Sequence, residues 1–501
     1  MLYLFSQADT SCRFNWAHKK LTNRLLQLGA QVVGDRAESD EQHPEGIDGA
    51  FIPWLTQLRS RLLVQYPLPA GVEPIPDDVL LPPKWVLQSV GDSTANAGNG
   101  RLKPSDDAVP NGIQANIVKN DRVTSASHWQ DVRHLTLHLE GQHEYVPGDI
   151  LTIYPRNFPV DIDHFLNICG WTNIADNELM FVPTDREEHD RDPTAYPAAP
   201  IPALQTSRFT LRDLLTRHLD IMSIPRRSFF AHLVHYTNDE FHAERLKEFT
   251  NPELIDELFD YTTRPRRSIL EVLDEFTSVK LPWQKVCSII PTLRGRQFSI
   301  ASGGALKACP TGSGETPRTK VELLIAIVKY RTVIKRIREG VCTRYVASLE
   351  PGQDVTVTLQ KGGLHPKESD MLKPVIMIGP GTGVAPMRSL IFERAAWRDR
   401  HPEVIQGMED ILFFGCRNED SDYFFKSEWE EFAKLGSLKT IVAFSRDQVG
   451  SYCFVHHNTM MLMNSTATKS LRPRSGTAAI WIGIQSARRE RWYGICLWLV
   501  W

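Results

Sequence analysis

Four adjacent residues near the middle of the chain, Arg296-Gln297-Phe298-Ser299, combine side chains that suit a flavin nucleotide. An arginine guanidinium binds pyrophosphate oxygens, an aromatic ring stacks on an isoalloxazine system, and a hydroxyl can reach the reactive nitrogen of the flavin. In a strand, Arg296 and Phe298 share one face, and Gln297 and Ser299 share the other. Taken alone, the pattern more often describes an edge strand with an exposed arginine and a buried phenylalanine.

A second motif, Gly340-Val341-Cys342-Thr343, precedes a segment of helical pattern at 344–349. The first turn of a helix has backbone N–H groups without intrahelical partners, so a glycine turn at this place can bind an anion. Thr343 also has a side chain suited to a helix N-cap. Without further support, an ordinary capped helix explains this motif better than a ligand site does.

Three glycines at alternate positions occur in Gly379-Pro380-Gly381-Thr382-Gly383, between a predicted strand at 374–378 and a predicted helix at 386–397. Such a loop lets the backbone approach a phosphate, and the dipole of the following helix stabilises the negative charge. The spacing is neither the GxGxxG of a dinucleotide-binding fold nor a P-loop with its GK[ST] ending. The loop is therefore a candidate phosphate site of intermediate specificity.

Ser445-Arg446 comes directly after a predicted strand at 440–444. Ligands of parallel sheets lie at the carboxyl ends of the strands. A serine and an arginine there can hold the 2′-phosphate that distinguishes NADPH from NADH. A solvated arginine after a strand explains the pair at least as well. Cys416, at the end of a predicted strand at 411–415, is interpreted as a small buried residue.

These motifs lie on two kinds of pattern. Residues 373–448 alternate between strand and helix, which is typical of a parallel nucleotide-binding sheet. Upstream, β-branched and aromatic residues predict strands at 132–139, 148–154, 297–301, 321–328 and 355–360. Between the first two of these strands and the other three, the spacing of apolar residues predicts helices at 208–219, 226–249, 252–259 and 268–276. We interpret this arrangement as a β-barrel with a helical insertion at about 160–280.

The two ends of the chain differ from this pattern. Residues 1–66 predict helices at 15–28 and 51–65 and a strand-like piece at 31–33, so we expect the last part of an α/β domain whose beginning lies upstream. Residues 67–112 are rich in Pro, Gly, Asp, Ser and Asn and predict a linker. Residues 449–501 have no clean period, and we interpret them as an aberrant or non-homologous tail.

Composition argues against several classes of protein. The 501 residues include 57 Lys and Arg and 60 Asp and Glu, a net charge of −3, so no nucleic-acid partner is expected. No apolar run approaches the ~20 residues of a membrane span, so no membrane partner is expected either. The 8 cysteines form no CxxC pair, and no metal site is predicted. Scattered cysteines in a chain of this length are typical of reduced thiols in the cytosol.

In their order along the chain, RQFS, GVCT, GPGTG, FGCRN and SRD resemble the ferredoxin–NADP-reductase-type module of the diflavin reductases, over about 113–448. FNWAHKKLTNRLLQLGA and ESDEQHPEGIDGAFIPWL are similar to the end of that family's flavodoxin-like domain. DEQHPEG and AFSRDQ are most similar to the branch that serves cytosolic iron–sulfur protein assembly. The implied fold is α/β plus β-barrel, with a partial flavodoxin-like FMN domain (1–66), a linker (67–112), an FAD-binding domain (113–365) and an incomplete NADPH-binding domain (366–448).

The resemblance also implies roles for individual residues. The implied FAD-binding residues are Arg245, Arg296, Gln297, Phe298, Ser299, Gly340, Val341, Cys342 and Thr343. The implied NADPH-binding residues are Gly379, Gly381, Thr382, Gly383, Ser445 and Arg446. Ser299 would be catalytic, with its hydroxyl at the hydride-accepting nitrogen. Asp9, Asn15 and Glu41 correspond to positions that face FMN. Because the family's FMN phosphate loop is not recognisable, FAD and NADPH are the expected cofactors and FMN is expected in intact relatives.

The implied activity is electron transfer from NADPH through FAD, and through FMN in intact relatives, to an iron–sulfur acceptor protein of the anamorsin type. The implied location is the cytoplasm, with mitochondria as a second location. Two alternatives stay open. One is a single-flavin NADPH dehydrogenase, and the other is a non-catalytic truncated product that keeps only partner-binding surfaces. Flavin content separates the three readings, because they predict two flavins, one flavin and none.

Overall fold

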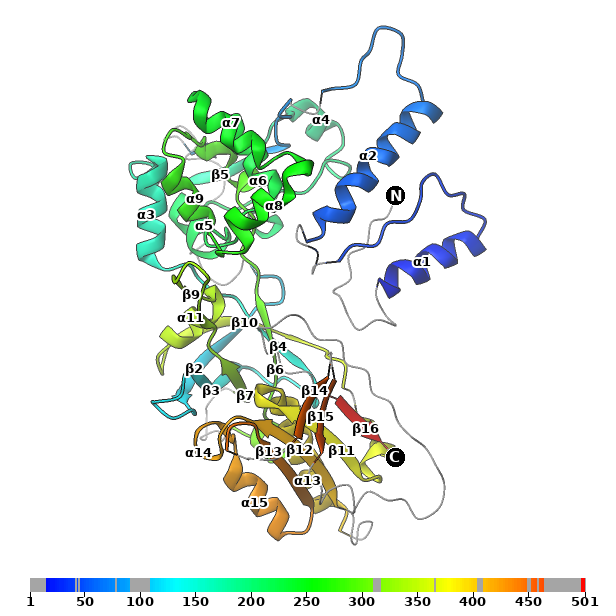
Figure 1. Cartoon of the computed structure of the whole chain (residues 1–501), viewed down its shortest axis with the longest axis vertical. Helices are drawn as coiled ribbons and strands as arrows, with labels where there is room; N and C mark the ends of the chain where they lie inside the picture. The colour runs from blue at the N-terminus through cyan, green and yellow to red at the C-terminus, as the bar shows by residue number, and fades with distance from the viewer. Residues whose placement is uncertain are drawn as a thin grey trace.

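The structure is a computed structural model of the chain. It describes residues 15–40, 43, 46–76, 79–90, 109–309, 317–364, 366–402 and 409–447, and the strands β14 (Tyr452–His456), β15 (Thr459–Met463) and β16 (Leu497–Val500). Figure 1 shows a helical region at one end of the long axis, an antiparallel sheet in the middle and a parallel sheet at the other end. The two sheets correspond to the two kinds of sequence pattern.

The middle region is a six-stranded antiparallel sheet in the order β6-β4-β10-β2-β3-β7. Its strands are β2 (Ile113–Arg122), β3 (Val132–Glu140), β4 (Ile150–Ile153), β6 (Arg296–Ser299), β7 (Arg318–Ala326) and β10 (Asp354–Gln360). The two edges meet just beyond β6, where Ile300 forms a bridge with Leu323 and the Ala301 N–H donates to the Glu322 carbonyl at 2.7 Å. The sheet is therefore curled on itself, and the expected barrel is confirmed.

Alternating apolar residues fill the inside of this barrel. Strand β3 buries Leu135, Leu137 and Leu139 completely. Helix α11 (Val341–Ser348) packs Cys342 and Val346 into the same core. The hairpin of β8 (Lys329–Arg331) and β9 (Ile337–Glu339) leads into α11. The barrel thereby holds the beginning of α11, which carries the GVCT motif, in a fixed place.

The helical region is inserted between β4 and β6. Its elements are α3 (Pro159–Cys169), β5 (Leu179–Pro183), α4 (Arg186–Arg191), α5 (Leu211–Arg217), α6 (Arg227–Val234), α7 (Glu240–Glu248), α8 (Ile255–Leu258), α9 (Ile269–Glu275) and α10 (Val286–Ile289). It has its own core, built around Phe165, Phe230 and Phe249. The single helix predicted over 226–249 is two helices, because the Asp239 side chain accepts the His242 N–H and starts α7.

The linker predicted over 67–112 needs one correction. Residues Trp85–Ser89 form β1, which pairs antiparallel with β5 of the helical region. Trp85 and Leu87 are buried in the helical core. The average composition of the segment hid these five residues, because a single short strand is stabilised by its partner and not by its own neighbours. Residues 91–108 lie outside the described part of the chain.

The parallel sheet contains β11 (Val375–Pro380), β12 (Asp410–Cys416) and β13 (Leu438–Phe444), in the order β13-β12-β11-β16. Its helices are α12 (Glu368–Met371), α13 (Ala385–Arg400), α14 (Glu419–Asp422) and α15 (Lys426–Lys434). Strand β16 comes from the segment interpreted as a tail and pairs antiparallel with β11, whereas β14 pairs with β15. The βαβ pattern predicted over 373–448 is confirmed.

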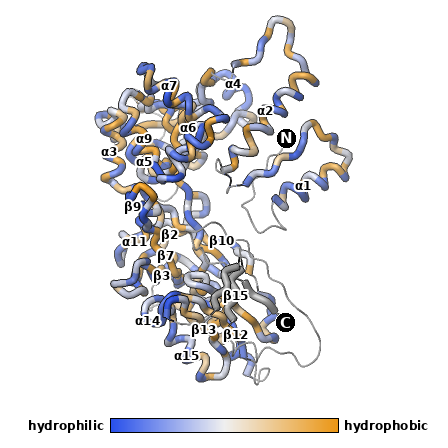
Figure 2. Tube along the Cα trace, viewed as in Figure 1, coloured by the Kyte–Doolittle hydropathy of each residue, from blue (hydrophilic) through white to orange (hydrophobic). Residues whose placement is uncertain are grey.

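In the described residues before β1, the chain forms the helices α1 (Trp16–Gln27) and α2 (Asp48–Gln65). The strand-like piece predicted at 31–33 is not a strand, and Val32 and Val33 are exposed. Figure 2 shows hydrophobic residues on both helices. Leu25 and Leu26 of α1 and its C-cap residue Leu28 are exposed. Among the helices described, none combines the length and apolar character needed to cross a membrane.

Candidate functional site

Strand β6 carries the RQFS motif at one edge of the barrel sheet. It pairs with β4, so that Phe298 lies opposite Leu151 and Ser299 opposite Ile150. The Phe298 ring is half-buried against the barrel core, whereas Arg296 and Ser299 are exposed. Gln297 donates its side-chain amide to the Gln360 Oε1 at 2.9 Å. The strand therefore presents a cation, a hydroxyl and part of an aromatic ring to a ligand.

The GVCT motif starts α11, as predicted, but its side chains have structural partners. Gly340 occupies the N-cap position, so the prediction of Thr343 as N-cap is wrong. The Thr343 hydroxyl accepts the Val328 N–H at 3.0 Å and donates to the Gly340 carbonyl at 3.3 Å. Burial raises the pKa of the Cys342 thiol to about 12. Backbone N–H groups of the first turn are what this motif offers to an anion.

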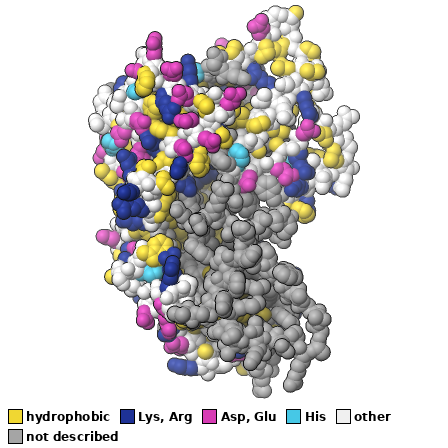
Figure 3. Space-filling model, in the orientation of Figure 1, with side chains coloured by type: hydrophobic (Ala, Val, Ile, Leu, Met, Phe, Trp, Pro, Cys, Tyr) yellow, Lys and Arg dark blue, Asp and Glu magenta, His cyan; other side chains and the backbone are white. Residues whose placement is uncertain are grey.

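The RQFS and GVCT motifs both belong to the barrel domain. The positive charge of Arg296 opposes the effect of burial on the pKa of Cys342 in the first turn of α11. Figure 3 shows Lys and Arg side chains gathered over β9 and α11. Helix α9 neutralises part of this charge, because Glu271 accepts from Arg336 at 2.6 Å and from Arg338 at 2.9 Å. The barrel edge and the beginning of α11 therefore form one basic surface suited to a pyrophosphate.

Arg245 is not part of this group. It lies on α7, which Figure 1 places at the far end of the helical region from the barrel. Its guanidinium forms ion pairs with Glu248 and Glu257 and lies 4.5 Å from the centre of the Phe249 ring. The structure gives Arg245 a role in packing the helical region, and it does not bring this residue to the other predicted flavin contacts.

The glycine loop connects β11 to the 16-residue helix α13. A Cβ atom at Gly379 would come within 2.8 Å of the Val384 Cα, so the close turn requires glycine there. Gly381 has a left-handed φ of 55°, and the place of its missing Cβ is open. The backbone at Thr382 and Gly383 leads into the first turn of α13, which has the polarity to bind a phosphate.

The strands β12 and β13 bring a second basic group to the same edge of the sheet. The Ser445 N–H donates to the Cys416 carbonyl, and the Arg446 N–H donates to the Arg417 carbonyl, both at 2.9 Å. Burial and the neighbouring charge of Arg446 lower the pKa of Arg417. Its guanidinium lies 4.3 Å from the centre of the Trp129 ring. Two adjacent cations beside a serine suit a phosphate dianion.

Arg417 is a residue that the sequence reasoning did not select. It belongs to FGCRN, directly after β12, just as Arg446 follows β13. The signal was present, because both arginines follow parallel neighbouring strands whose carboxyl ends share one edge. Cys416 itself is buried, as expected, and burial raises the pKa of its thiol.

The FMN positions are largely undescribed. Asp9 and Glu41 lie outside the described residues. Asn15 is buried, with a left-handed φ of 51°, and its Nδ2 donates to the Ser39 carbonyl at 3.2 Å. In the described residues, the side-chain amide of Asn15 therefore stabilises the segment before α2.

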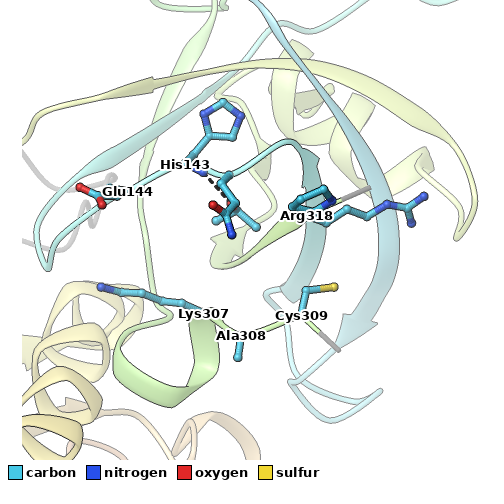
Figure 4. A pocket seen from close by; sticks show the side chains of 9 residues that line it. His143, Glu144, Lys307, Ala308, Cys309 and Arg318 are labelled. Atoms are coloured by element: carbon cyan, nitrogen blue, oxygen red, sulfur yellow. Dashed lines mark hydrogen bonds between the residues drawn. The ribbon is translucent and has the colours of Figure 1, made fainter. Parts of the chain in front are cut away.

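A separate pocket of about 400 Å³ lies beside the barrel, between β7 and the turn at Gly304–Lys307 (Figure 4). His143, Lys307 and Arg318 line it, together with Cys309, whose Sγ lies 3.5 Å from the His138 Nε2. None of the predicted site residues that the structure describes lines this pocket. In the part of the chain that the structure describes, no group of three or more His, Cys, Asp or Glu is placed to hold a metal ion.

The barrel and the parallel sheet share one hydrophobic core. Val132, Ala301 and Leu324 of the barrel pack in one cluster with Met377 and Phe414 of the sheet. Strand β6, the predicted flavin strand, and the glycine loop at 379–383 are therefore parts of two domains with a common boundary. This arrangement is what a transfer between two bound nucleotides requires, because the reacting groups must be held next to each other.

Comparison with known proteins identifies the two domains. Residues 106–345 match the family model described as FAD binding domain, and residues 377–471 match the one described as oxidoreductase NAD-binding domain. A relative from Aspergillus fumigatus named NADPH-dependent diflavin oxidoreductase 1 is 48% identical over 469 residues, which are 89% of this chain and 70% of the relative. The chain belongs to the NADPH-dependent diflavin oxidoreductase family.

Other diflavin oxidoreductases of the same name extend the range of the similarity. The one from Schizosaccharomyces pombe is 37% identical and the match covers 89% of this chain and 71% of the relative. The one from Xenopus laevis is 36% identical and the match covers 91% and 74%. The family identifies this chain as an oxidoreductase with FAD and NADPH as cofactors. The match to the NAD-binding model also extends through 449–471, into the segment interpreted as non-homologous.

The residues present fit both cofactors of the diflavin oxidoreductases. The exposed Arg296 beside the first turn of α11 suits the flavin pyrophosphate. The open backbone at Gly381, at the start of α13, suits the pyrophosphate of NADPH. The adjacent charges of Arg417 and Arg446 suit its 2′-phosphate. Which residues contact each cofactor stays a prediction.

Proposed function

We propose that this oxidoreductase delivers electrons from NADPH through FAD to an iron–sulfur acceptor protein of the anamorsin type, in cytosolic iron–sulfur protein assembly. One observation carries the proposal: the flavin strand and the glycine loop lie in two domains packed on one core. The resemblance of DEQHPEG and AFSRDQ supports the choice of acceptor. We place the protein in the cytoplasm, with mitochondria as a second location.

The barrel supplies the flavin contacts in this proposal. Arg296 and the N–H groups at the start of α11 bind the pyrophosphate. Phe298 supports the isoalloxazine ring, and the Ser299 hydroxyl hydrogen-bonds at the reactive nitrogen. When bound, FAD supplies hydride acceptance and the release of electrons one at a time, which an iron–sulfur cluster requires.

The parallel sheet supplies the contacts for NADPH. The glycine loop at 379–383 binds the pyrophosphate through backbone N–H groups and the positive end of α13. Ser445, Arg417 and Arg446 bind the 2′-phosphate. A bidentate guanidinium contact discriminates strongly against a coenzyme that lacks this phosphate, because the cations would then remain without their anion.

The number of flavins separates two forms of this function. The relatives' name denotes two flavins, and FMN is the second flavin in our proposal for intact relatives. The alternative is a single-flavin NADPH dehydrogenase. It is favoured by the one described FMN position, Asn15, whose side-chain amide donates to the Ser39 carbonyl.

Flavin extraction from the purified chain tests the cofactor assignment. We expect one FAD per chain, and FMN at the same level would identify the two-flavin form. Arg296→Ala should raise the Kd of FAD at least tenfold, because loss of a charged hydrogen bond costs about 1.5–3 kcal/mol, and should thereby lower the FAD that stays bound. Arg294→Ala is the matched control, since Arg294 is also exposed and lies two residues away. Equal FAD in both variants would remove Arg296 from the site.

The acceptor assignment needs its own measurement. The purified chain and an anamorsin-type iron–sulfur protein are mixed without oxygen, NADPH is added, and cluster reduction is followed by absorbance. We expect catalytic reduction that is lost in Arg296→Ala and kept in Arg294→Ala. Reduction of ferricyanide without reduction of the iron–sulfur protein would support the single-flavin dehydrogenase. The absence of both activities and of flavin would support the non-catalytic alternative.

A further inference from the structure

A cluster of charged residues is buried at the boundary between the barrel and the parallel sheet. Arg388, on α13, is 2% exposed. Its Nη1 donates to the Glu322 Oε2 of β7 at 2.6 Å. Its Nε and Nη2 form a bidentate pair with Glu428 of α15, both at 2.7 Å. Lys320 and His134 also contact Glu322. We call these five residues the Arg388 cluster: Arg388, Glu322, Glu428, Lys320 and His134.

The charges of the Arg388 cluster balance. The Lys320 Nζ lies 2.6 Å from the Glu322 Oε1, and the His134 Nε2 lies 3.1 Å from its Oε2. Burial alone would raise the pKa of Glu322, but the hydrogen bond from His134 and the charges of Arg388 and Lys320 outweigh it, so the pKa lies well below its usual value. Two cations, Arg388 and Lys320, thus face two carboxylates, Glu322 and Glu428.

The cluster contacts the chain next to the flavin motif. The Arg388 Nη1 also donates to the Ala301 carbonyl at 3.1 Å, two residues after Ser299. The neighbouring Ser389 Oγ donates to the Ser302 carbonyl at 2.7 Å. A Cβ atom at Gly303 would come within 2.0 Å of the Ser389 carbonyl oxygen, so the two backbones touch. Residues of α13 thus hydrogen-bond to the backbone of the segment that follows β6.

The same helix begins at the glycine loop. Residue 388 lies in the first turns of α13, which starts at Ala385 directly after the loop. Because the geometry of an α-helix is regular, residues a few positions apart in it keep a fixed distance and direction from each other. One side chain therefore connects the strand that carries Ser299 to the loop proposed for NADPH.

Stability alone does not explain why this boundary contains charges. Taking ions out of water costs several kcal/mol for each ion, and well-packed apolar residues of similar volume are often equally stable. A bidentate arginine pair differs from apolar packing in that it accepts only one relative orientation of its partners. The observations therefore favour a role in orientation.

We propose that Arg388 is a positioning residue for hydride transfer, which fixes the end of β6 relative to the glycine loop through Glu322 and the Ala301 carbonyl. In the reaction it serves, the hydride leaves NADPH, which is oxidised, and the flavin is reduced. Arg388 contacts neither reactant in this proposal. It acts by keeping the two binding sites in one relative placement, because a shift of about 1 Å can lower a rate about 100-fold.

Arg388→Lys tests the proposal, with Arg394→Lys as the matched control. Arg394 lies on the same helix and is 1% exposed, and its Nε donates to Asp410 at 2.8 Å inside the sheet domain. Four quantities are measured on the full chain: bound FAD, the Kd of 2′,5′-ADP by calorimetry, the rate of flavin reduction at saturating NADPH, and the isotope effect of NADPH deuterated at the transferred position.

We expect Arg388→Lys to lower the rate of flavin reduction at least tenfold and to increase the isotope effect, with FAD content and the Kd of 2′,5′-ADP within twofold of the parent. Arg394→Lys should lower the thermal midpoint and leave the rate within twofold. Glu322→Gln changes the barrel side of the ion pair and should change the rate and the isotope effect in the same way as Arg388→Lys. If Arg388→Lys does not fold, the result for Glu322→Gln alone tests the proposal.

Three outcomes would overturn the proposal. The first is an unchanged rate in Arg388→Lys or in Glu322→Gln. The second is a rate that falls only in proportion to lost FAD. The third is an equal loss of rate in Arg394→Lys, which would mean that any buried arginine of α13 acts through the stability of the sheet domain.

Discussion

At the scale of single residues, the loops after β12 and β13 are tied to each other. Asp447 accepts from the Asn418 Nδ2 at 2.6 Å and from the Glu419 N–H at 2.7 Å. Asp422 accepts the N–H groups of Arg417 and Asn418. These carboxylates hold two loops in place and leave the arginine side chains to other partners. The basic pair is therefore preorganised, which lowers the entropic cost of binding a phosphate.

Arg446→Ala should weaken the binding of NADPH far more than that of NADH. Loss of a charged hydrogen bond of about 1.5–3 kcal/mol predicts a KM for NADPH about 10- to 100-fold higher. The KM for NADH should change less than twofold, because NADH has no 2′-phosphate. Steady-state kinetics with ferricyanide as acceptor measures both constants.

Arg400→Ala is the control for this comparison. Arg400 is exposed at the end of α13 opposite the glycine loop, so its removal changes the net charge equally and leaves the basic pair intact. An equal rise in both KM values after Arg446→Ala would contradict the assignment of Arg446 to the 2′-phosphate.

Short motifs were predictable from the sequence because their chemistry lies in four or five consecutive residues. RQFS, GVCT and GPGTG each fall on the strand or turn expected for them. Side-chain partners were not predictable. The Thr343 hydroxyl accepts a hydrogen bond from Val328, which lies fifteen residues away in the sequence. Arg245 lies on a helix distant from the barrel, where it forms ion pairs with Glu248 and Glu257. A motif specifies a local backbone, and the fold decides which side chains remain available.

At the scale of elements, a strand depends on its partner. Residues Trp85–Ser89 have few strand signals around them, yet they form β1 because β5 lies beside them and the helical core covers Trp85 and Leu87. The piece at 31–33 has two adjacent valines and no strand forms. Propensity was a weak guide in both cases, since pairing and burial supply most of the stabilisation of a strand.

His218, the half-buried C-cap residue of α5, should make the helical region sensitive to pH. Burial lowers the pKa of His218 to about 4 from its ordinary value of 6.5, and the charge of Arg217 adds to this effect. The unfolded chain therefore binds a proton at a higher pH than the folded one does. Stability should fall as the pH drops through this window, by about 2 kcal/mol between pH 7 and pH 5.

His218→Gln should remove this part of the pH dependence. Hydrogen–deuterium exchange of α5, read at pH 7 and pH 5 and corrected for the intrinsic exchange rate, reports the local free energy of opening in both proteins. The control is His235→Gln, because His235 lies in the same region and is exposed. If the parent and His218→Gln lose equal stability between the two pH values, His218 is not the group responsible.

At the scale of the whole molecule, the polar contacts between the barrel and the parallel sheet include two that lie at different places on their boundary. One is the buried Arg388 cluster. The other joins the loop after β2 to the segment after β12, where Ser125 donates to Ser421 of α14 at 3.3 Å and Arg417 lies over Trp129. Neither contact was predictable from periodicity, because Arg388 and Glu322 are 66 residues apart and Ser125 and Ser421 are 296 apart. The boundary between the domains was expected, but the residues that form it were not.

The contact between Trp129 and Arg417 connects the barrel to the proposed 2′-phosphate site, so a change in the barrel should affect the choice of coenzyme. Trp129 is 56% exposed and comes from a barrel loop, but it orients Arg417 beside Arg446. A cation–π contact at an exposed site contributes about 0.5–1 kcal/mol, so Trp129→Ala should raise the KM for NADPH about 2- to 5-fold. The KM for NADH and the bound FAD should not change.

Trp129→Phe distinguishes the stacking from other effects of the loop. A phenylalanine ring keeps the contact with the guanidinium, so this variant should restore most of the affinity for NADPH that Trp129→Ala loses. The Kd of 2′,5′-ADP, measured by calorimetry, should follow the same order in the three proteins. If alanine and phenylalanine weaken NADPH and NADH to the same extent, the loop affects the packing of the two domains and not the phosphate-binding arginine. Arg417 would then bind the coenzyme independently of the barrel.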